Sequence, residues 1–153
     1  MAAQPMAWVL PEQEGKAVEW LNAKGEAVYP HDWLKTRPAL KKQWQQTVAR
    51  VAPKTAMHNW MHNMSGVETP IETVNLRGKV YARFWMCQPR NCAGNKASVL
   101  IDLQGKRQEL YAFHVYTVTD PQKPGYHVSR TETRMYGHPV DFELAYLKAM
   151  HGG

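Results

Sequence analysis

The sequence has only two cysteines, no long apolar run and no recognisable catalytic motif. Two cysteines in 153 residues exclude a disulfide-rich framework, so a hydrophobic core has to hold the fold together. No segment approaches the roughly 18 consecutive apolar residues that a membrane-spanning helix needs. Phosphate-binding glycine loops and cysteine–histidine signatures are missing as well. We therefore expect a protein that spans no membrane, binds no cofactor and is not an enzyme.

Acidic residues are also in short supply. The chain has 13 Asp and Glu against 19 Lys and Arg, which gives a formal net charge of +6 at pH 7. Such an excess suggests an acidic partner: a nucleic acid, an anionic envelope polymer or an acidic protein cleft. Tyr81 and Trp85 alternate with Lys79 and Arg83, a pattern that would suit the stacking of bases or sugars. A sheet face covered by helices explains the same pattern, and we prefer it, so no nucleic-acid partner is predicted.

His58 and His62 are four residues apart, as metal ligands on one helical face often are. The Glu that follows the first His in zinc proteases is absent, and no third ligand is evident. We interpret the two residues as solvated histidines and predict no metal site.

Apolar residues at helical spacing predict three helices. The first begins near Pro38, where proline suits the first turn, and ends at Pro53. The second covers residues 54–64 and the third residues 139–150. The residues expected to face the core are Leu40, Trp44, Val48 and Val51 in the first, Met57, Trp60, Met61 and Met64 in the second, and Val140, Leu144, Leu147 and Met150 in the third. A short helix at residues 16–23 is a further option.

Strand patterns follow the second helix. They cover residues 71–76, 79–86, 97–103, 108–118 and 126–135. The fourth segment is apolar on both faces, as a central strand should be, and the polar fifth is expected at an edge. Residues 120–125 are predicted to form a loop. The result is an α+β fold, an antiparallel sheet of about five strands flanked by helices, in one domain of residues 8–153.

Both cysteines lie between the second and third strand patterns, in Cys87-Gln88-Pro89-Arg90-Asn91-Cys92. In a reducing cytosol they would be free thiols or half of a metal site. The proline favours a tight turn that brings the two side chains to disulfide distance, so we expect a Cys87–Cys92 disulfide and export from the cytosol. We call residues 87–92 the finger. Its polar tip residues are not needed for a core, and we expect them to bind a target.

Residues 1–7, Met1-Ala2-Ala3-Gln4-Pro5-Met6-Ala7, resemble the small-residue end of a bacterial signal peptide. The charged and apolar regions that should precede such an end are absent. We interpret the segment as a signal-peptide remnant or a cloning scar and leave it out of the fold.

The finger and its continuation, Ala93-Gly94-Asn95 and the apolar Val99-Leu100-Ile101, resemble the signature of the Ivy family, inhibitors of vertebrate lysozyme. The Gly137-His138-Pro139 break before the last helix fits as well. The resemblance implies a periplasmic protein with an antiparallel sheet flanked by helices. It also implies that the disulfide-closed loop plugs the active-site cleft of c-type lysozyme.

In that family the loop has the pattern Cys-Lys-Pro-His-Asp-Cys. Cys87, Pro89 and Cys92 match it, whereas Gln88, Arg90 and Asn91 replace Lys, His and Asp. The resemblance implies that Arg90 meets the catalytic carboxylates of the target, with Gln88 and Asn91 beside it and Pro89 setting the shape. We expect Arg83, Trp85, Asn95 and Lys96 to support the loop.

The expected partner is thus a lysozyme-type muramidase, with the c-type favoured. A lytic transglycosylase of the cell's own envelope is an alternative target, since its cleft would meet the same finger. A peptidoglycan-binding envelope protein that inhibits no enzyme is a further alternative.

Overall fold

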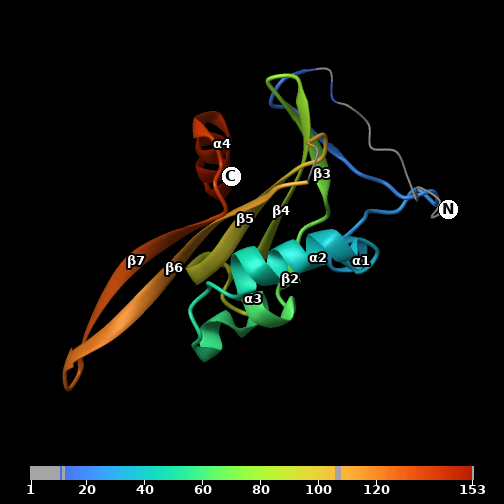
Figure 1. Ribbon diagram of the computed structural model, residues 1–153. Coiled ribbons are helices and arrows are strands. Elements are labelled where there is room, and N and C mark those ends of the chain that lie inside the picture. The colour runs from blue at the N-terminus through green and yellow to red at the C-terminus, as the bar shows by residue number, and fades with distance from the viewer. Residues whose placement is uncertain (1–10, 12, 106–107, 153) are drawn as a thin grey trace.

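The computed structural model describes residues 11, 13–105 and 108–152 of the chain (Figure 1). Its centre is a seven-stranded sheet in the order β1-β3-β4-β5-β6-β7, in which every pair is antiparallel and β2 adds to β4. The strands are β1 (Ala17–Glu19), β2 (Val67–Glu68), β3 (Glu72–Leu76), β4 (Lys79–Cys87), β5 (Asn95–Asp102), β6 (Leu110–Lys123) and β7 (Tyr126–Tyr136). The α+β prediction is confirmed. The sheet has more than the five expected strands because β1 and β2 are too short to show alternation in the sequence.

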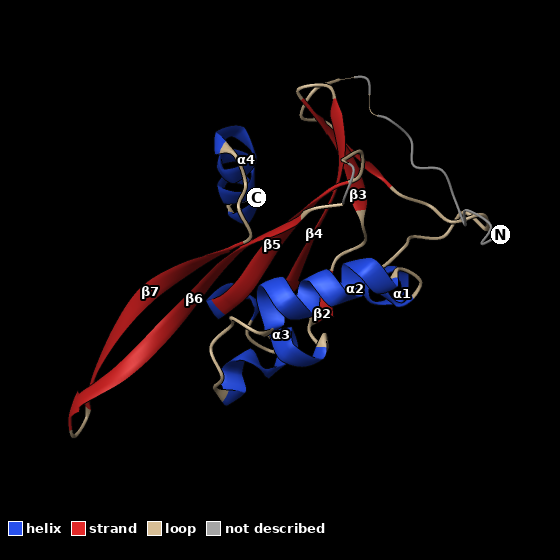
Figure 2. Ribbon diagram, viewed as in Figure 1, coloured by secondary structure: helices blue, strands red, loops and turns tan. Residues whose placement is uncertain are grey.

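Helices lie on both faces of the sheet (Figure 2). One face carries α1 (Pro30–Lys35), α2 (Pro38–Trp44) and α3 (Asn59–Asn63), together with a π turn at Gln45–Ala49 and a 3-10 turn at Ala56–His58. The other face carries α4 (Asp141–His151), whose Leu147 and Met150 are buried. None of the described helices is both long and apolar enough to cross a membrane.

The alternation in β4 builds both layers of the core. Val80, Ala82, Phe84 and Met86 are buried against α1–α3, as predicted. On the opposite face, the buried Tyr81 donates a hydrogen bond to Glu143 of α4 over 2.5 Å, and the Trp85 indole donates to the carbonyl of Met150. Helix α4 therefore covers the face that could otherwise have been a stacking platform.

Two helix predictions need correction. Residues 16–23 hold a strand, because β1 pairs with the edge of β3 and this pairing outweighs the local pattern. The predicted core face of the first helix is wrong at Val51, which is 52% exposed, while its neighbour Ala52 is buried. The π turn adds a residue to the helical turn and so shifts the phase of the stripe by one position.

The second and third helices also begin or end differently from the prediction. The second consists of the 3-10 turn and α3, and it ends at Met64 in the left-handed conformation (φ 51°). The third begins at Asp141, which leaves Val140 as its exposed N-terminal cap rather than a core residue.

The predicted loop at 120–125 is mostly strand. Strand β6 continues to Lys123 and turns at Pro124 and Gly125 into β7. The pairing with β5 stops at Asn95↔Tyr116, so residues 117–131 form a two-stranded ribbon that extends beyond the sheet (Figure 1). We call this ribbon the arm. Beyond Tyr116 the outer edge of β6 pairs with no described strand. Pro121 is tolerated there because no neighbouring strand needs its missing N–H.

Candidate functional site

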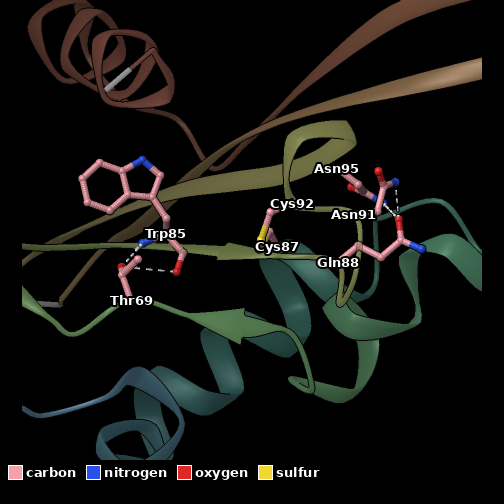
Figure 3. The surroundings of a disulfide bond; sticks show 7 residues. All are labelled: Thr69, Trp85, Cys87, Gln88, Asn91, Cys92 and Asn95. Atoms are coloured by element: carbon pink, nitrogen blue, oxygen red, sulfur yellow. Dashed lines mark hydrogen bonds between the residues drawn. A yellow bond between two sulfur atoms is a disulfide. The ribbon is translucent and has the colours of Figure 1, made fainter.

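The finger connects the end of β4 to the start of β5 and is closed at its base by the Cys87–Cys92 disulfide (Figure 3). The two Cα atoms are 4.9 Å apart. Three backbone hydrogen bonds fold the loop back on itself, from Gln88 N to Asn95 O, from Asn91 N to Gln88 O and from Gly94 N to Asn91 O. The segment is therefore a compact turn with few free torsions.

The tip residues have unequal roles. The Asn91 amide donates to Gln88 Oε1 over 2.9 Å, so these two side chains bind each other across the turn. Arg90 is exposed, and its backbone is left-handed with φ 67°. Among the described residues, no hydrogen bond or ion pair engages its guanidinium. The loop thus presents one charged group, the Arg90 guanidinium, whose N–H donors are available to a binding partner.

Gly94 lets the loop close tightly. A Cβ atom at this position would lie 2.5 Å from Asn91 Oδ1, closer than real contacts allow. A larger residue would therefore make the exposed Asn91 side chain turn and give up its hydrogen bond to Gln88. Glycine at position 94 leaves that hydrogen bond in place.

Asn95 anchors the finger to the rest of the fold. This fully buried amide donates to the carbonyl of Met57 over 2.8 Å and to Gln88 Oε1 over 3.3 Å. Its Oδ1 lies 2.6 Å from His114 Nε2, and because an amide oxygen only accepts, His114 must donate from Nε2. One side chain thus joins the loop, the 3-10 turn and strand β6.

A cluster of buried polar rings lies beneath Asn95. His114 stacks on Tyr116, and its Nδ1 lies 3.2 Å from the Tyr136 hydroxyl. His58 packs edge-on against His114 and Tyr116 and is only 1% exposed. The interpretation of His58 as a solvated histidine was therefore wrong. His62 is half-buried and has its Nε2 2.9 Å from the Pro53 carbonyl.

The ring cluster should make the stability of the fold sensitive to pH. Burial, and then the charges of His58 and Arg134, lower the pKa of His114 to about 3, and burial also lowers that of His58. The unfolded chain then binds more protons than the folded one below about pH 6.5, so stability falls as the pH falls. We expect His114 to cost about 2 kcal/mol at pH 5 relative to pH 7.5.

Urea unfolding between pH 5 and 7.5 measures this loss. His114→Gln keeps a donor for Asn95 and should flatten the pH dependence, although it lowers stability throughout. His127→Gln, at an exposed position of the arm, is the matched control and should leave the slope unchanged. An equal slope in wild type and His114→Gln would contradict this role.

The four residues expected to support the finger do not form one group. Asn95 lies directly beneath it, as described. Trp85 and Lys96 line a pocket of about 310 Å³ that also contains both cysteines, Val67, Glu68 and Thr69. Arg83 lies farther along β4, where it pairs with Glu72 over 2.8 Å and donates to the Tyr146 hydroxyl. Its guanidinium also lies over the Trp85 ring, 5.0 Å from the centroid, so Arg83 fixes α4 and reaches the loop only through Trp85.

Sequence reasoning missed His58, His114 and Tyr136 as parts of this site. They come from three distant segments: the pairing of β6 with β7 brings His114 and Tyr136 together, and the 3-10 turn, which Asn95 holds through the Met57 carbonyl, brings His58 to them. The one available signal was a polar His114 within an otherwise apolar, central strand, since a buried polar group needs partners.

The fold and its site define a small α+β protein that holds one rigid, polar loop at the end of an antiparallel sheet. The family model described as "Inhibitor of vertebrate lysozyme (Ivy)" matches residues 39–127, more than half of the chain. The chain therefore belongs to the Ivy family, and the resemblance noted in the finger is confirmed. A protein named "Inhibitor of vertebrate lysozyme" from Pseudomonas aeruginosa is 25% identical over 126 residues, 82% of this chain and 79% of the relative.

Proposed function

We propose that this protein inhibits a lysozyme-type muramidase by inserting the finger into the active-site cleft. The observation that carries the proposal is the finger itself, a disulfide-closed loop whose one charged tip residue, Arg90, is exposed and unpaired among the described residues. Membership of the Ivy family and the name of the Pseudomonas relative support the choice of target. A loop that is ordered before binding loses little conformational entropy in the complex.

The chemistry of the tip suits a pair of carboxylates. A retaining glycosidase holds its two catalytic carboxyl groups about 5 Å apart. A guanidinium can donate to both and keeps its charge at any working pH. The side chains of Gln88 and Asn91 are hydrogen-bonded to each other, which shapes the tip. Their remaining donors and acceptors can add hydrogen bonds to the target at the sides of the tip. In this arrangement Arg90 blocks the catalytic groups directly.

The disulfide also supports a location outside the reducing cytosol. Disulfides persist in oxidising compartments such as the bacterial periplasm. We propose export to the periplasm, where the protein would meet a muramidase that attacks the cell wall. The proposed signal-peptide remnant at residues 1–7 lies outside the described residues.

One observation favours a second target class. Arg90 and Asn91 stand where the family pattern has His and Asp, and these positions would touch the enzyme. A longer side chain with a permanent charge fits a deeper or more acidic cleft. A lytic transglycosylase of the cell's own envelope is therefore our alternative target.

An inhibition panel tests the proposal. The purified protein is titrated against c-type, g-type and phage lysozymes and a lytic transglycosylase, with turbidity loss of cell walls as the readout. We expect stoichiometric inhibition of the c-type enzyme. Inhibition of the transglycosylase alone would select the alternative target. A protein that sediments with purified sacculi but slows none of the enzymes would be a wall-binding module, and the proposal would be wrong.

A further inference from the structure

The pocket of about 310 Å³ at the base of the finger has no part in the insertion of Arg90. We call it the side pocket. Its lining comes from β2 and the residue after it, the end of β4, the disulfide and the start of β5: Val67, Glu68, Thr69, Trp85, Cys87, Cys92 and Lys96. The disulfide is thus a wall that the finger and the side pocket share (Figure 3). A target that takes up the finger would lie against this pocket as well.

Strand register gathers the walls of the side pocket on one face of the sheet. Val67 pairs with Cys87, and Cys87 pairs with Lys96. Side chains of cross-strand partners point to the same face, and so does Trp85, two residues before Cys87. Met86 between them is buried in the core on the opposite, helical face. The side pocket therefore opens on the α4 face, with a valine, an indole and a disulfide as apolar walls and a lysine beside them.

Trp85 is fixed before any target binds. Its indole donates to the Met150 carbonyl over 2.9 Å, and the Arg83 guanidinium lies over its ring. Its backbone N–H donates to Thr69 Oγ1 over 2.9 Å. An aromatic surface that is held in place in the free protein loses little entropy when a partner packs on it. Such rings are frequent anchors of protein interfaces.

The charge in the side pocket is positive. Lys96 is half-buried, and no hydrogen bond or ion pair within the described part of the chain engages its ammonium group. Glu68 is the acidic residue of the lining, but it lies opposite Met86, and its Oε1 accepts a hydrogen bond from the backbone N–H of His31 in α1. Its carboxylate is therefore directed to the helical layer and does not neutralise Lys96.

We propose that the side pocket binds an acidic side chain of the target, from the rim of the cleft that takes the finger. The carboxylate would pair with the Lys96 ammonium, and its methylene groups would pack on Trp85 and Val67. An aliphatic side chain would take water from Lys96 without giving it a partner, and a basic one would be repelled. The inference rests on the proposed function, because the finger has to bring the rim to the pocket.

The side pocket would also choose among targets. Retaining glycosidases share the pair of catalytic carboxylates that Arg90 is proposed to meet, so the tip of the finger distinguishes them poorly. Residues at the rim of a cleft lie outside the chemistry and can differ from one muramidase to another. An acid at the matching place on the rim would add affinity, and a lysine or arginine there would oppose binding.

Removal of the lysine charge tests the pairing, with the muramidase that the inhibition panel selects. Lys96→Met keeps a flexible aliphatic chain and should raise the inhibition constant about fivefold. Lys96→Glu should raise it further, because it repels the acid. The difference between Lys96→Met and wild type should shrink at high salt, which screens a charge pair but not a packing contact. Lys42→Met, at an exposed position of α2, is the charge control and should match wild type.

Filling the side pocket is a second, independent test. Val67 is 50% exposed, so Val67→Trp adds a ring to the pocket without disturbing the core. It should weaken inhibition about tenfold or more. Val128→Trp is the matched control, since Val128 is 51% exposed but lies on the arm, and it should inhibit like wild type. Thermal melting of each variant shows whether it is folded.

The outcomes separate this inference from the proposed function. An unchanged inhibition constant in Lys96→Met or in Val67→Trp, with Arg90→Ala still impaired, would overturn the side pocket and leave the finger in place. A loss in Lys96→Met that persists at high salt, or an equal loss in Lys42→Met, would overturn the charge pair. A wild type that inhibits no muramidase would overturn both proposals.

Discussion

Replacing Arg90 by alanine is expected to weaken inhibition by about 30-fold or more, while the melting temperature stays nearly unchanged. A hydrogen-bonded charge pair buried in an interface is worth about 2–5 kcal/mol when one partner is truncated, and 1.4 kcal/mol corresponds to a factor of ten. The side chain is exposed and makes no hydrogen bond or ion pair among the described residues, so the fold does not depend on it. Inhibition constants and thermal melts of both proteins provide the measurement.

Arg77→Ala is a charge control for this experiment, and it also removes the contact of the Arg77 guanidinium with the Phe142 ring. Arg77 is also an exposed arginine with a left-handed backbone (φ 53°), but it lies in the turn between β3 and β4, at the opposite end of the sheet. Both variants therefore lose one positive charge at a strained position. Arg90→Lys keeps the charge without the two-pronged geometry and should give an intermediate loss. Equal potency of Arg90→Ala and wild type would remove Arg90 from the proposed contact.

Removing the disulfide should affect binding more than folding. In the chain-entropy model, a closed loop of about six residues stabilises the fold by roughly 2 kcal/mol. The Cys87→Ser/Cys92→Ser variant should lose about that much in urea unfolding. Its finger must then be ordered during binding, at about 1 kcal/mol for each residue that is fixed. We expect inhibition to weaken roughly 100-fold as two or three residues are ordered on contact.

A core variant separates the two effects of this change. Val48→Ala truncates a fully buried side chain on the helical layer and should also cost about 2 kcal/mol of stability. It leaves the finger and its hydrogen bonds in place, so its inhibition constant should match that of wild type. If Val48→Ala and the cysteine variant lost inhibition equally, general stability rather than the rigidity of the finger would explain both results.

The sequence predicted those parts of the fold that depend on local periodicity. The alternation from Lys79 to Met86 placed both core layers correctly, and the proline at 38 marked the start of a helix. The cysteine spacing predicted the closed loop and where it lies between two strands. These features follow from side-chain direction and backbone restriction, which act within a few residues.

Features that depend on distant contacts or on small changes of phase were not predictable in the same way. The cluster of His58, His114 and Tyr136 is assembled by the pairing of β6 with β7 and by the packing of the 3-10 turn against them, and no single segment encodes it. The π turn that buries Ala52 in place of Val51 leaves no signature in composition. Pro121 and Pro124 suggested a loop, but the open edge of the arm accepts a proline within a strand.

The left-handed backbone at position 90 limits how the target range of such a protein can drift. Asparagine, aspartate and histidine adopt this conformation more readily than other non-glycine residues, whereas β-branched side chains are nearly excluded. Substitutions that exchange a cation, an imidazole or an amide at this position are therefore accessible in single steps without rebuilding the loop. Valine, isoleucine and threonine would have to reshape the turn first. Specificity can thus diversify in charge and length at one residue while the shape of the loop stays fixed.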